Sequence, residues 1–301
     1  MKRFNSIAFA LTAVCAVAMS SHAQIIVNDT WADGNRTSTG PDGSGIDSQW
    51  FSSSGAALTV PAAGDMRAAI PAGSLSETTY FASQTLANTG DELMFTWAFT
   101  PNGTLNGVNT SQGFNLAVVN GATHLTSDSG SPASQVYAGY AMYMNMSSTL
   151  GNGNPYALKE WILGATPGAL LSASANWGAN GLTGQLANGA TTGNTGYAIG
   201  TTYTLVMTLT RNASSGLDIT TTTIGGSLNG TGSATLAYTD ATPNTFTYDT
   251  FALRQSGSAS GVTQLDTSLF KVEFISVPEP ATFALAGLGL LGLVFARRMR
   301  R

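Results

Sequence analysis

Apolar and polar residues alternate along several segments of this chain, and this alternation constrains the fold more than any other feature. In 93–100 every second side chain is large and apolar, and 203–210 and 269–274 show the same period of two. Such a period places alternate side chains on opposite faces of a β-strand. Each segment is therefore predicted to be a strand, and 202–223, with turn residues at 212–216, is predicted to be a hairpin.

Further segments carry the same signal more weakly. They are 56–60, 78–86, 113–119, 135–144, 234–239 and 246–253. The segment 156–163 fits either a helical turn or another strand, because its periodicity does not decide between them. Short strands joined by Gly, Asn and Asp turns predict an all-β fold, an antiparallel β-sandwich of the jelly-roll type.

Residues 24–276 form a body of 253 residues between two apolar terminal segments, a length that one all-β domain can reach. Six basic and fifteen acidic residues give this body a net charge of −9, and the cations are scattered. Nucleic-acid binding needs clustered Lys and Arg, so no nucleic-acid partner is expected. Charged residues are only 9% of the chain. The resulting surface, rich in hydroxyls and amides, is compatible with a polysaccharide matrix.

The N-terminus has the three parts of a secretory signal peptide. Lys2 and Arg3 precede an apolar stretch at 7–19, and Ala23 follows a small residue two positions earlier. We expect residues 1–23 to direct export of the chain through the Sec machinery, and signal peptidase to cut between Ala23 and Gln24. An uncleaved N-terminal anchor is the alternative. Val14 stands before the single cysteine where a lipoprotein signal needs a small residue, and the body itself holds no cysteine for a disulfide.

The last 25 residues also combine three parts in order. The polar motif is Val277-Pro278-Glu279-Pro280, and a basic cluster ends the chain with Arg297, Arg298, Arg300 and Arg301. The uncharged apolar segment 281–296 separates them and is predicted to be a single transmembrane helix. Sixteen helical residues span roughly 24 Å, somewhat less than a hydrocarbon core of about 30 Å. The arginines are expected to hold the C-terminus on the cytoplasmic side of a membrane.

This tail, 277–301, resembles the PEP-CTERM sorting signal of Gram-negative bacteria. The resemblance implies an exosortase partner that recognises Pro278-Glu279-Pro280, a transient stay in the inner membrane, and release to the cell surface or to an exopolysaccharide matrix. A plain anchor that is never removed is the alternative. Such tails also carry the label of an ice-binding protein C-terminal region. Ice binding is not expected, because the threonines here lie on the outward sides of predicted strands rather than in long flat ranks.

The body resembles concanavalin A-like, or laminin G-like, β-sandwiches. The resemblance rests on diffuse patterns at 29–37, 47–50, 203–211 and 248–254. It implies the sandwich fold and is compatible with carbohydrate binding.

An Asp- and Gly-rich segment is the one candidate metal site. Its potential oxygen ligands are Asp29, Asp33, Asn35, Asp42 and Asp47. Calcium takes six to eight oxygen ligands, which such loops can supply. No other cofactor is expected, and the same residues are also those of ordinary turns.

The sequence offers little catalytic chemistry. His124 is the one histidine of the body and is expected to be a loop residue without a catalytic role. Glycoside hydrolysis needs two facing carboxylates, and no strand carries an alternating set of them. Glu160 beside Trp161 is a weak candidate for sugar binding, and a packed tryptophan next to a solvated carboxylate is the alternative.

These observations favour a non-enzymatic protein of the cell surface, sorted by an exosortase and associated with exopolysaccharide. A sandwich-fold glycoside hydrolase or lyase is the second interpretation. An adhesin without a small ligand is the third.

Overall fold

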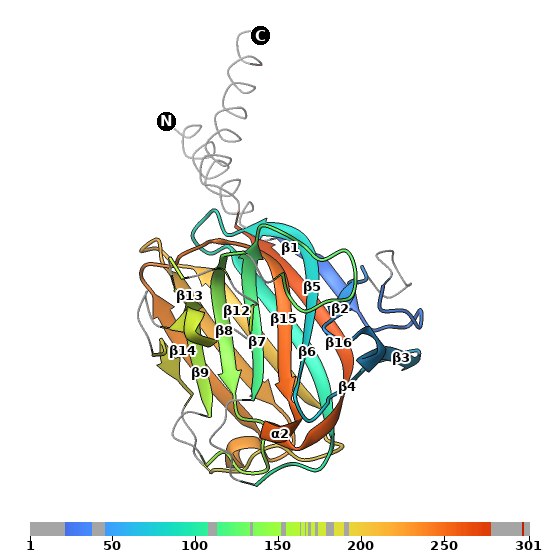
Figure 1. Cartoon of the computed structure of the whole chain (residues 1–301). Coiled ribbons are helices and arrows are strands. Elements are labelled where there is room, and N and C mark those ends of the chain that lie inside the picture. The colour runs from blue at the N-terminus through green and yellow to red at the C-terminus, as the bar shows by residue number, and fades with distance from the viewer. Residues whose placement is uncertain are drawn as a thin grey trace.

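The body is a sandwich of two eight-stranded antiparallel sheets, seen face-on in the computed structural model of Figure 1. The structure describes residues 22–37, 46–107, 113–132, 135–151, 155–162, 164–165, 167, 170–171, 174–178, 184–189, 193–277 and 297.

Sheet A runs in the order β14 (Ser233–Asp240), β13 (Leu217–Ile224), β12 (Tyr203–Arg211), β6 (Glu92–Gly103), β16 (Val262–Ser276), β4 (Asp65–Ala69) and β3 (Leu58–Ala62), and β1 (His22–Asp29) also pairs with β16. Sheet B runs β10 (Trp177–Gly178), β9 (Tyr156–Trp161), β8 (Tyr137–Met144), β7 (Phe114–Gly121), β15 (Thr247–Ser256), β5 (Ser74–Thr85) and β2 (Trp50–Ser52), and β11 (Ala187–Asn188) also pairs with β9. The described helices are short: η1 (Gly55–Ala57), η2 (Ser174–Asn176), η3 (Leu228–Gly230) and α2 (Gly257–Ser260).

The antiparallel β-sandwich predicted from the alternation is confirmed. The segment 93–100 lies in β6, and 202–223 forms the β12–β13 hairpin. The sequence pattern of 156–163 fits a helical turn or a strand equally, and the structure shows that this segment contains strand β9. Sequence reasoning missed β1, β2 and β4.

Large aromatic side chains fill the space between the sheets. Phe251 of β15 contacts the rings of Trp50, Phe95, Trp97 and Phe270 at centroid distances of 4.8 to 6.5 Å. All five are fully buried. Because β6 and β15 belong to different sheets, this cluster fastens the two layers together.

A second buried cluster lies on the opposite, outer face of sheet B. Trp161 and Trp177 meet edge to face at 5.2 Å and pack with Tyr137 and Tyr143. Residues 170–171, from the chain between β9 and β10, cover part of this cluster. Sheet B is therefore buried on both sides along part of its surface.

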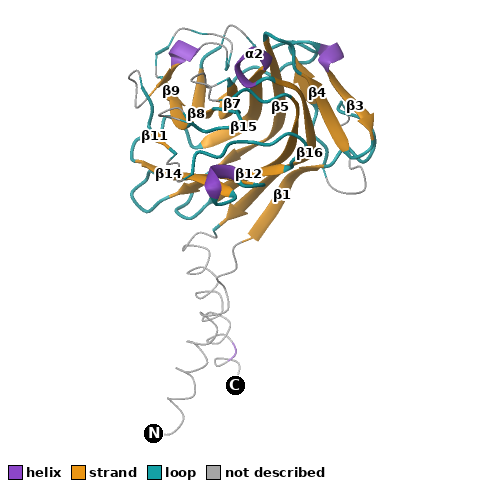
Figure 2. Cartoon of the chain, turned by 90° about the horizontal axis from the view of Figure 1, so that it is seen from below, coloured by secondary structure: helices purple, strands orange, loops and turns teal. Residues whose placement is uncertain are grey.

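The chain enters and leaves the body at the same place. His22 at the start of β1 is paired with Ser276 at the end of β16. Both strand ends lie at one end of the sandwich (Figure 2). The two terminal segments are consequently attached to neighbouring points of the folded domain.

Candidate functional site

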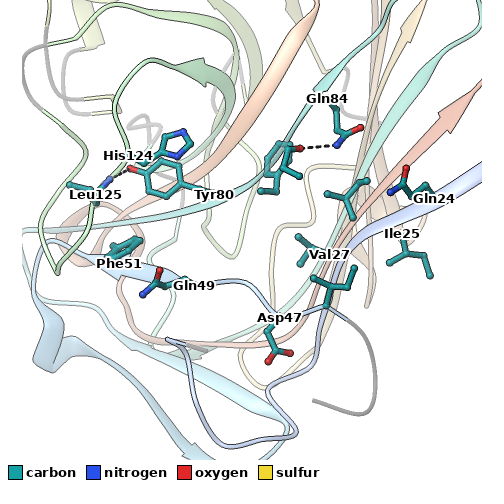
Figure 3. A pocket seen from close by; sticks show the side chains of 14 residues that line it. Gln24, Ile25, Val27, Asp47, Gln49, Phe51, Tyr80, Gln84, His124 and Leu125 are labelled. Carbon is teal, nitrogen blue, oxygen red and sulfur yellow. Dashed lines mark hydrogen bonds between the residues drawn. The ribbon is translucent and has the colours of Figure 1, made fainter. Parts of the chain in front are cut away.

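A groove of about 470 Å³, open to solvent, lies where β1 of sheet A approaches the β2–β5 edge of sheet B (Figure 3). β1 contributes residues 24–27, and β5 contributes 80–82 and Gln84. Two stretches of loop, with His124 and Leu125 in one and Asp47 and Gln49 in the other, complete the lining.

Stacked rings form one wall of the groove. Tyr80 points outward from β5, and its ring stacks on His124 with the centroids 4.1 Å apart and the planes 16° apart. Phe51 of β2 lies on the other side of Tyr80, at 5.9 Å and tilted. The backbone N–H of Leu125 donates to the Tyr80 hydroxyl oxygen at 3.0 Å. Burial raises the pKa of Tyr80 to about 12, so its hydroxyl stays protonated at neutral pH and can itself donate.

A buried carboxylate holds His124 in this position. The Nε2 atom of His124 lies 3.3 Å from Oδ2 of Asp249, a residue of β15. Oδ1 of Asp249 accepts the backbone N–H of Gly121 at 3.0 Å. The imidazole ring is thus fixed from behind, while 44% of the His124 side chain remains exposed. The prediction that His124 is a loop residue is confirmed, and the structure adds that it lines a groove.

Amide and aliphatic groups line the rest of the groove. Gln49 and Gln84 present side-chain amides, each able to donate and accept hydrogen bonds. Gln84 Nε2 donates to the carbonyl of Ala82 at 2.8 Å. Ile25 and Ile46 are exposed apolar side chains of the rim. The groove therefore offers aromatic, aliphatic and neutral polar contacts together.

Four of the five predicted calcium ligands lie in the described part of the chain, and of these Asp29 and Asp47 are buried. Oδ1 of Asp29 accepts the N–H of Trp31 at 2.8 Å, and Oδ2 accepts both the N–H and the Oγ–H of Ser48. Asp33 and Asn35 are exposed, and each uses Oδ1 to cap a turn. These oxygens accept hydrogen bonds from backbone N–H groups and from the Ser48 hydroxyl. No set of three or more His, Cys, Asp or Glu residues that could hold a metal occurs in the described part of the chain. Asp42 lies outside the described residues, so calcium binding stays a prediction.

The predicted pairing of Glu160 and Trp161 at a sugar site is wrong for a geometric reason. The two residues are adjacent in β9 and point to opposite faces of sheet B. Glu160 faces the interior, where Oε1 accepts the N–H of Asn244 at 2.8 Å and burial raises the pKa of its carboxyl to about 7. Trp161 is fully buried in the outer cluster. They share no exposed surface.

The sorting tail leaves the body from a fixed point. The N–H of Val277, the first residue of the predicted motif, donates to Oδ1 of Asp91 at 2.8 Å, and Oδ2 accepts the N–H of Asn88 at 2.7 Å. Asp91 is buried, and Gly90 packs against the Val277 side chain. The chain is therefore attached to the folded domain as far as Val277, the residue before Pro278.

Most of the predicted terminal signals fall outside the described residues. These are 1–21, Pro278, Glu279, Pro280, the segment 281–296, Arg298, Arg300 and Arg301, while Arg297 is exposed. Within the described residues, no helix has the length and apolar character needed to cross a membrane. Ala23 and Gln24 lie in β1, so the predicted cleavage would remove the first two residues of that strand.

Comparison with protein families identifies the tail. Residues 276–301 match the family described as the PEP-CTERM protein-sorting motif. The chain carries a PEP-CTERM sorting signal. The predicted resemblance is confirmed over these residues. The signal indicates an exported precursor that is anchored in the membrane of a Gram-negative bacterium and processed by an exosortase.

The body is similar to solved sandwich structures at low identity. The exoplasmic/lumenal domain of VIP36 in its metal-free form shares 14% identity, covering 86% of this chain and 100% of that chain with a TM-score of 0.47. Lectin II from Ulex europaeus shares 9%, covering 85% and 99% with a TM-score of 0.46. A mutant of alginate lyase Aly36B in complex with alginate tetrasaccharide shares 13%, covering 83% and 96% with a TM-score of 0.42. A search among curated proteins finds no significant match.

The residues of the groove were missed by sequence reasoning. Tyr80 comes from a different segment than Gln49 and Phe51, and His124 lies far from all three in the sequence. The order of strands in the sheets brings them together, and no local pattern encodes that order.

Proposed function

We propose that the chain is a non-enzymatic glycan-binding protein of the cell surface or extracellular matrix, and that the groove lined by Tyr80 and His124 holds the glycan. The observation that carries this proposal is the pair of stacked rings, fixed from behind and placed beside the amides of Gln49 and Gln84.

The chemistry of this lining suits a sugar ring. A pyranose has an apolar C–H face, which packs on an aromatic ring, and hydroxyl groups at its rim, which need donors and acceptors. Pockets for small ligands combine such apolar walls with a few placed polar groups. The Tyr80 hydroxyl and the two glutamine amides supply those polar groups here.

The composition of the groove supports binding rather than cleavage. Asp47 is the one carboxylate among the described lining residues, and it is largely buried. Hydrolysis of a glycosidic bond ordinarily uses two carboxylates, one as acid and the other as base or nucleophile. A bound glycan would therefore be held intact.

The sorting signal supports a location outside the cell for this activity. In the proposed route the Sec machinery exports the precursor, signal peptidase removes the N-terminal segment, and an exosortase processes the tail. The processed protein then associates with exopolysaccharide, with which its weakly charged surface is compatible.

Alanine substitution at the groove tests the assignment. The full chain, solubilised in detergent micelles, is titrated with polysaccharides by calorimetry, together with the variants His124→Ala and Ile224→Ala. Both side chains are exposed, but Ile224 lies on β13 in the other sheet. His124→Ala should weaken binding by about three- to tenfold, as expected for one lost ring contact. Equal affinities for His124→Ala and the wild type would place the glycan elsewhere.

A further inference from the structure

Two cations on one face of sheet B have no acidic partner among the described residues. Arg36, Arg67 and Lys271 pair with Asp128, Asp266 and Glu273 at 2.7 to 2.8 Å. Arg211 donates to the carbonyl of Leu86 and lies over the ring of Phe246. Lys159 and Arg254 are the remaining two basic residues of the body, and neither has a carboxylate within 4 Å among the described residues. Arg254 donates to Oγ of Ser74 at 2.9 Å, a neutral group that leaves its positive charge unbalanced.

The strand register brings these two cations to the same surface. Arg254 of β15 is paired with Asn115 of β7, and Asn115 is paired in turn with Tyr143 of β8. All three belong to the outer face, since the neighbouring residues Leu253, Leu116 and Met142 belong to the core between the sheets. Strands lie about 4.8 Å apart, so the backbones of Arg254 and Tyr143 are roughly 10 Å apart. Tyr143 is paired with Ala157 of β9, and Lys159, two residues further along β9, reaches diagonally over Tyr143, with Nζ 4.4 Å from the centre of the Tyr143 ring.

Tyr143 contributes a hydroxyl without a partner. Only 4% of this residue is exposed, and its Oη atom makes no hydrogen bond with the described residues. Burial raises the pKa of Tyr143, so the hydroxyl is held in its protonated, donating form. A buried donor left unpaired is costly. Arg254 lies close enough to act on the Tyr143 hydroxyl, and Lys159 lies over the Tyr143 ring; neither cation has an ion-pair partner among the described residues.

We propose that Arg254, Lys159 and Tyr143 form a second subsite, separate from the groove, which binds the carboxylate of a uronic acid residue in an acidic polysaccharide. Arg254 and Lys159 are partly exposed and supply the charge, and the Tyr143 hydroxyl donates from beneath. An arginine fork matches a planar carboxylate. This inference extends the proposed glycan binding to a site that does not share residues with the groove.

The test uses a short probe with a neutral counterpart. The full chain in detergent micelles is titrated with trigalacturonate and with its fully methyl-esterified form, which has the same backbone without the negative charges. Variants Arg254→Gln and Lys159→Gln each remove one positive charge from the subsite. Lys271→Gln removes the same charge from the outer face of sheet A and serves as the matched control.

Arg254→Gln and Lys159→Gln should each weaken trigalacturonate binding about tenfold, the effect of losing a hydrogen bond to a charged group. Lys271→Gln should leave binding unchanged, and the methyl ester should bind poorly to every form. Equal weakening by Lys271→Gln and Arg254→Gln would show a general charge effect and overturn the proposal. Equal binding of trigalacturonate and its ester, or no binding of either, would also overturn it.

Tyr143→Phe separates binding from folding. The change removes only the unpartnered hydroxyl, so the melting temperature should hold or rise while trigalacturonate binding weakens. Weakened binding with a lowered melting temperature would assign the hydroxyl a structural role instead. His124→Ala should not change trigalacturonate binding. The proposal for the subsite and the proposal for the groove can therefore be refuted independently of each other.

Discussion

A buried acid on β5 makes the stability of this protein depend on pH. Glu77 is 1% exposed, and its Oε2 accepts one hydrogen bond, from Gln255 Nε2 at 3.3 Å. Oε1 of Glu77 and Oε1 of Gln255 find no donor among the described residues. Burial raises the pKa of the Glu77 carboxyl from 4.5 to about 7, with the Gln255 hydrogen bond and the charge of Arg36 opposing the rise. Protonation removes the buried charge and turns one of its oxygens into a donor.

The direction of the pH effect follows from the sign of that shift. The folded state binds the Glu77 proton more tightly than the unfolded state does, so this contribution to stability is fully present below pH 4.5. It is lost as the pH rises from 4.5 through about 7. A shift of this size corresponds to about 3 kcal/mol. For a domain of this length, that is roughly 6 to 12 °C in melting temperature.

Glu77→Gln tests this reasoning, because glutamine keeps the shape and cannot ionise. At pH 8 the variant should be more stable than the wild type by about 3 kcal/mol, and at pH 4.5 the two should be equal. Urea unfolding followed by tryptophan fluorescence at several pH values measures the difference. The carboxyl of Glu160, whose pKa burial also raises to about 7, titrates in both proteins and cancels in the comparison. Stability curves that run parallel from pH 4.5 to 8 would refute the account of Glu77.

Three further predictions concern the core and the tail. Phe251→Ala removes the ring shared by both layers and should cost about 3 to 5 kcal/mol in urea unfolding, and a cost below 1 kcal/mol would mean that the aromatic cluster does not fasten the sheets. Asp91→Ala releases the N–H of Val277 and should cost about 1 to 3 kcal/mol and expose the chain near residue 277 to protease, whereas unchanged cleavage would show that the tail is held otherwise. Replacing Pro278, Glu279 and Pro280 by alanine should leave unprocessed precursor in the inner membrane on immunoblots of cell fractions, and normal release of that variant would contradict exosortase sorting.

Local patterns in the sequence were sufficient to predict the central strands. In β6 and β12 the large residues alternate without interruption, because one face of each strand packs on the core and the other meets solvent. β2 escaped prediction because it has only three residues and all are buried, and β1 because a bulge between Ile25 and Val27 interrupts its alternation. β4 escaped because Met66 is the one large apolar side chain among its five residues. The tail was predictable because its three parts are contiguous.

The candidate sites depend on long-range structure that no local pattern records. Tyr80 and His124 meet because β5, β15 and β7 are neighbours in sheet B, although the sequence places them in separate segments. Arg254, Asn115 and Tyr143 share a row only through the register of three strands. The pairing of Glu160 with Trp161 failed for the opposite reason. The two residues are neighbours in the sequence, but successive side chains of a β-strand point to opposite faces, so the two do not share a surface.

The central claim is that this exported sandwich holds a glycan and leaves it intact. Its most direct test is retention of the full chain, in detergent micelles, on a column of the producing bacterium's own exopolysaccharide, with reducing sugar measured in the eluate. The account predicts retention that is lost or weakened in His124→Ala and no release of reducing sugar. Passage through the column without retention would contradict glycan binding, and release of reducing sugar would contradict the non-enzymatic assignment.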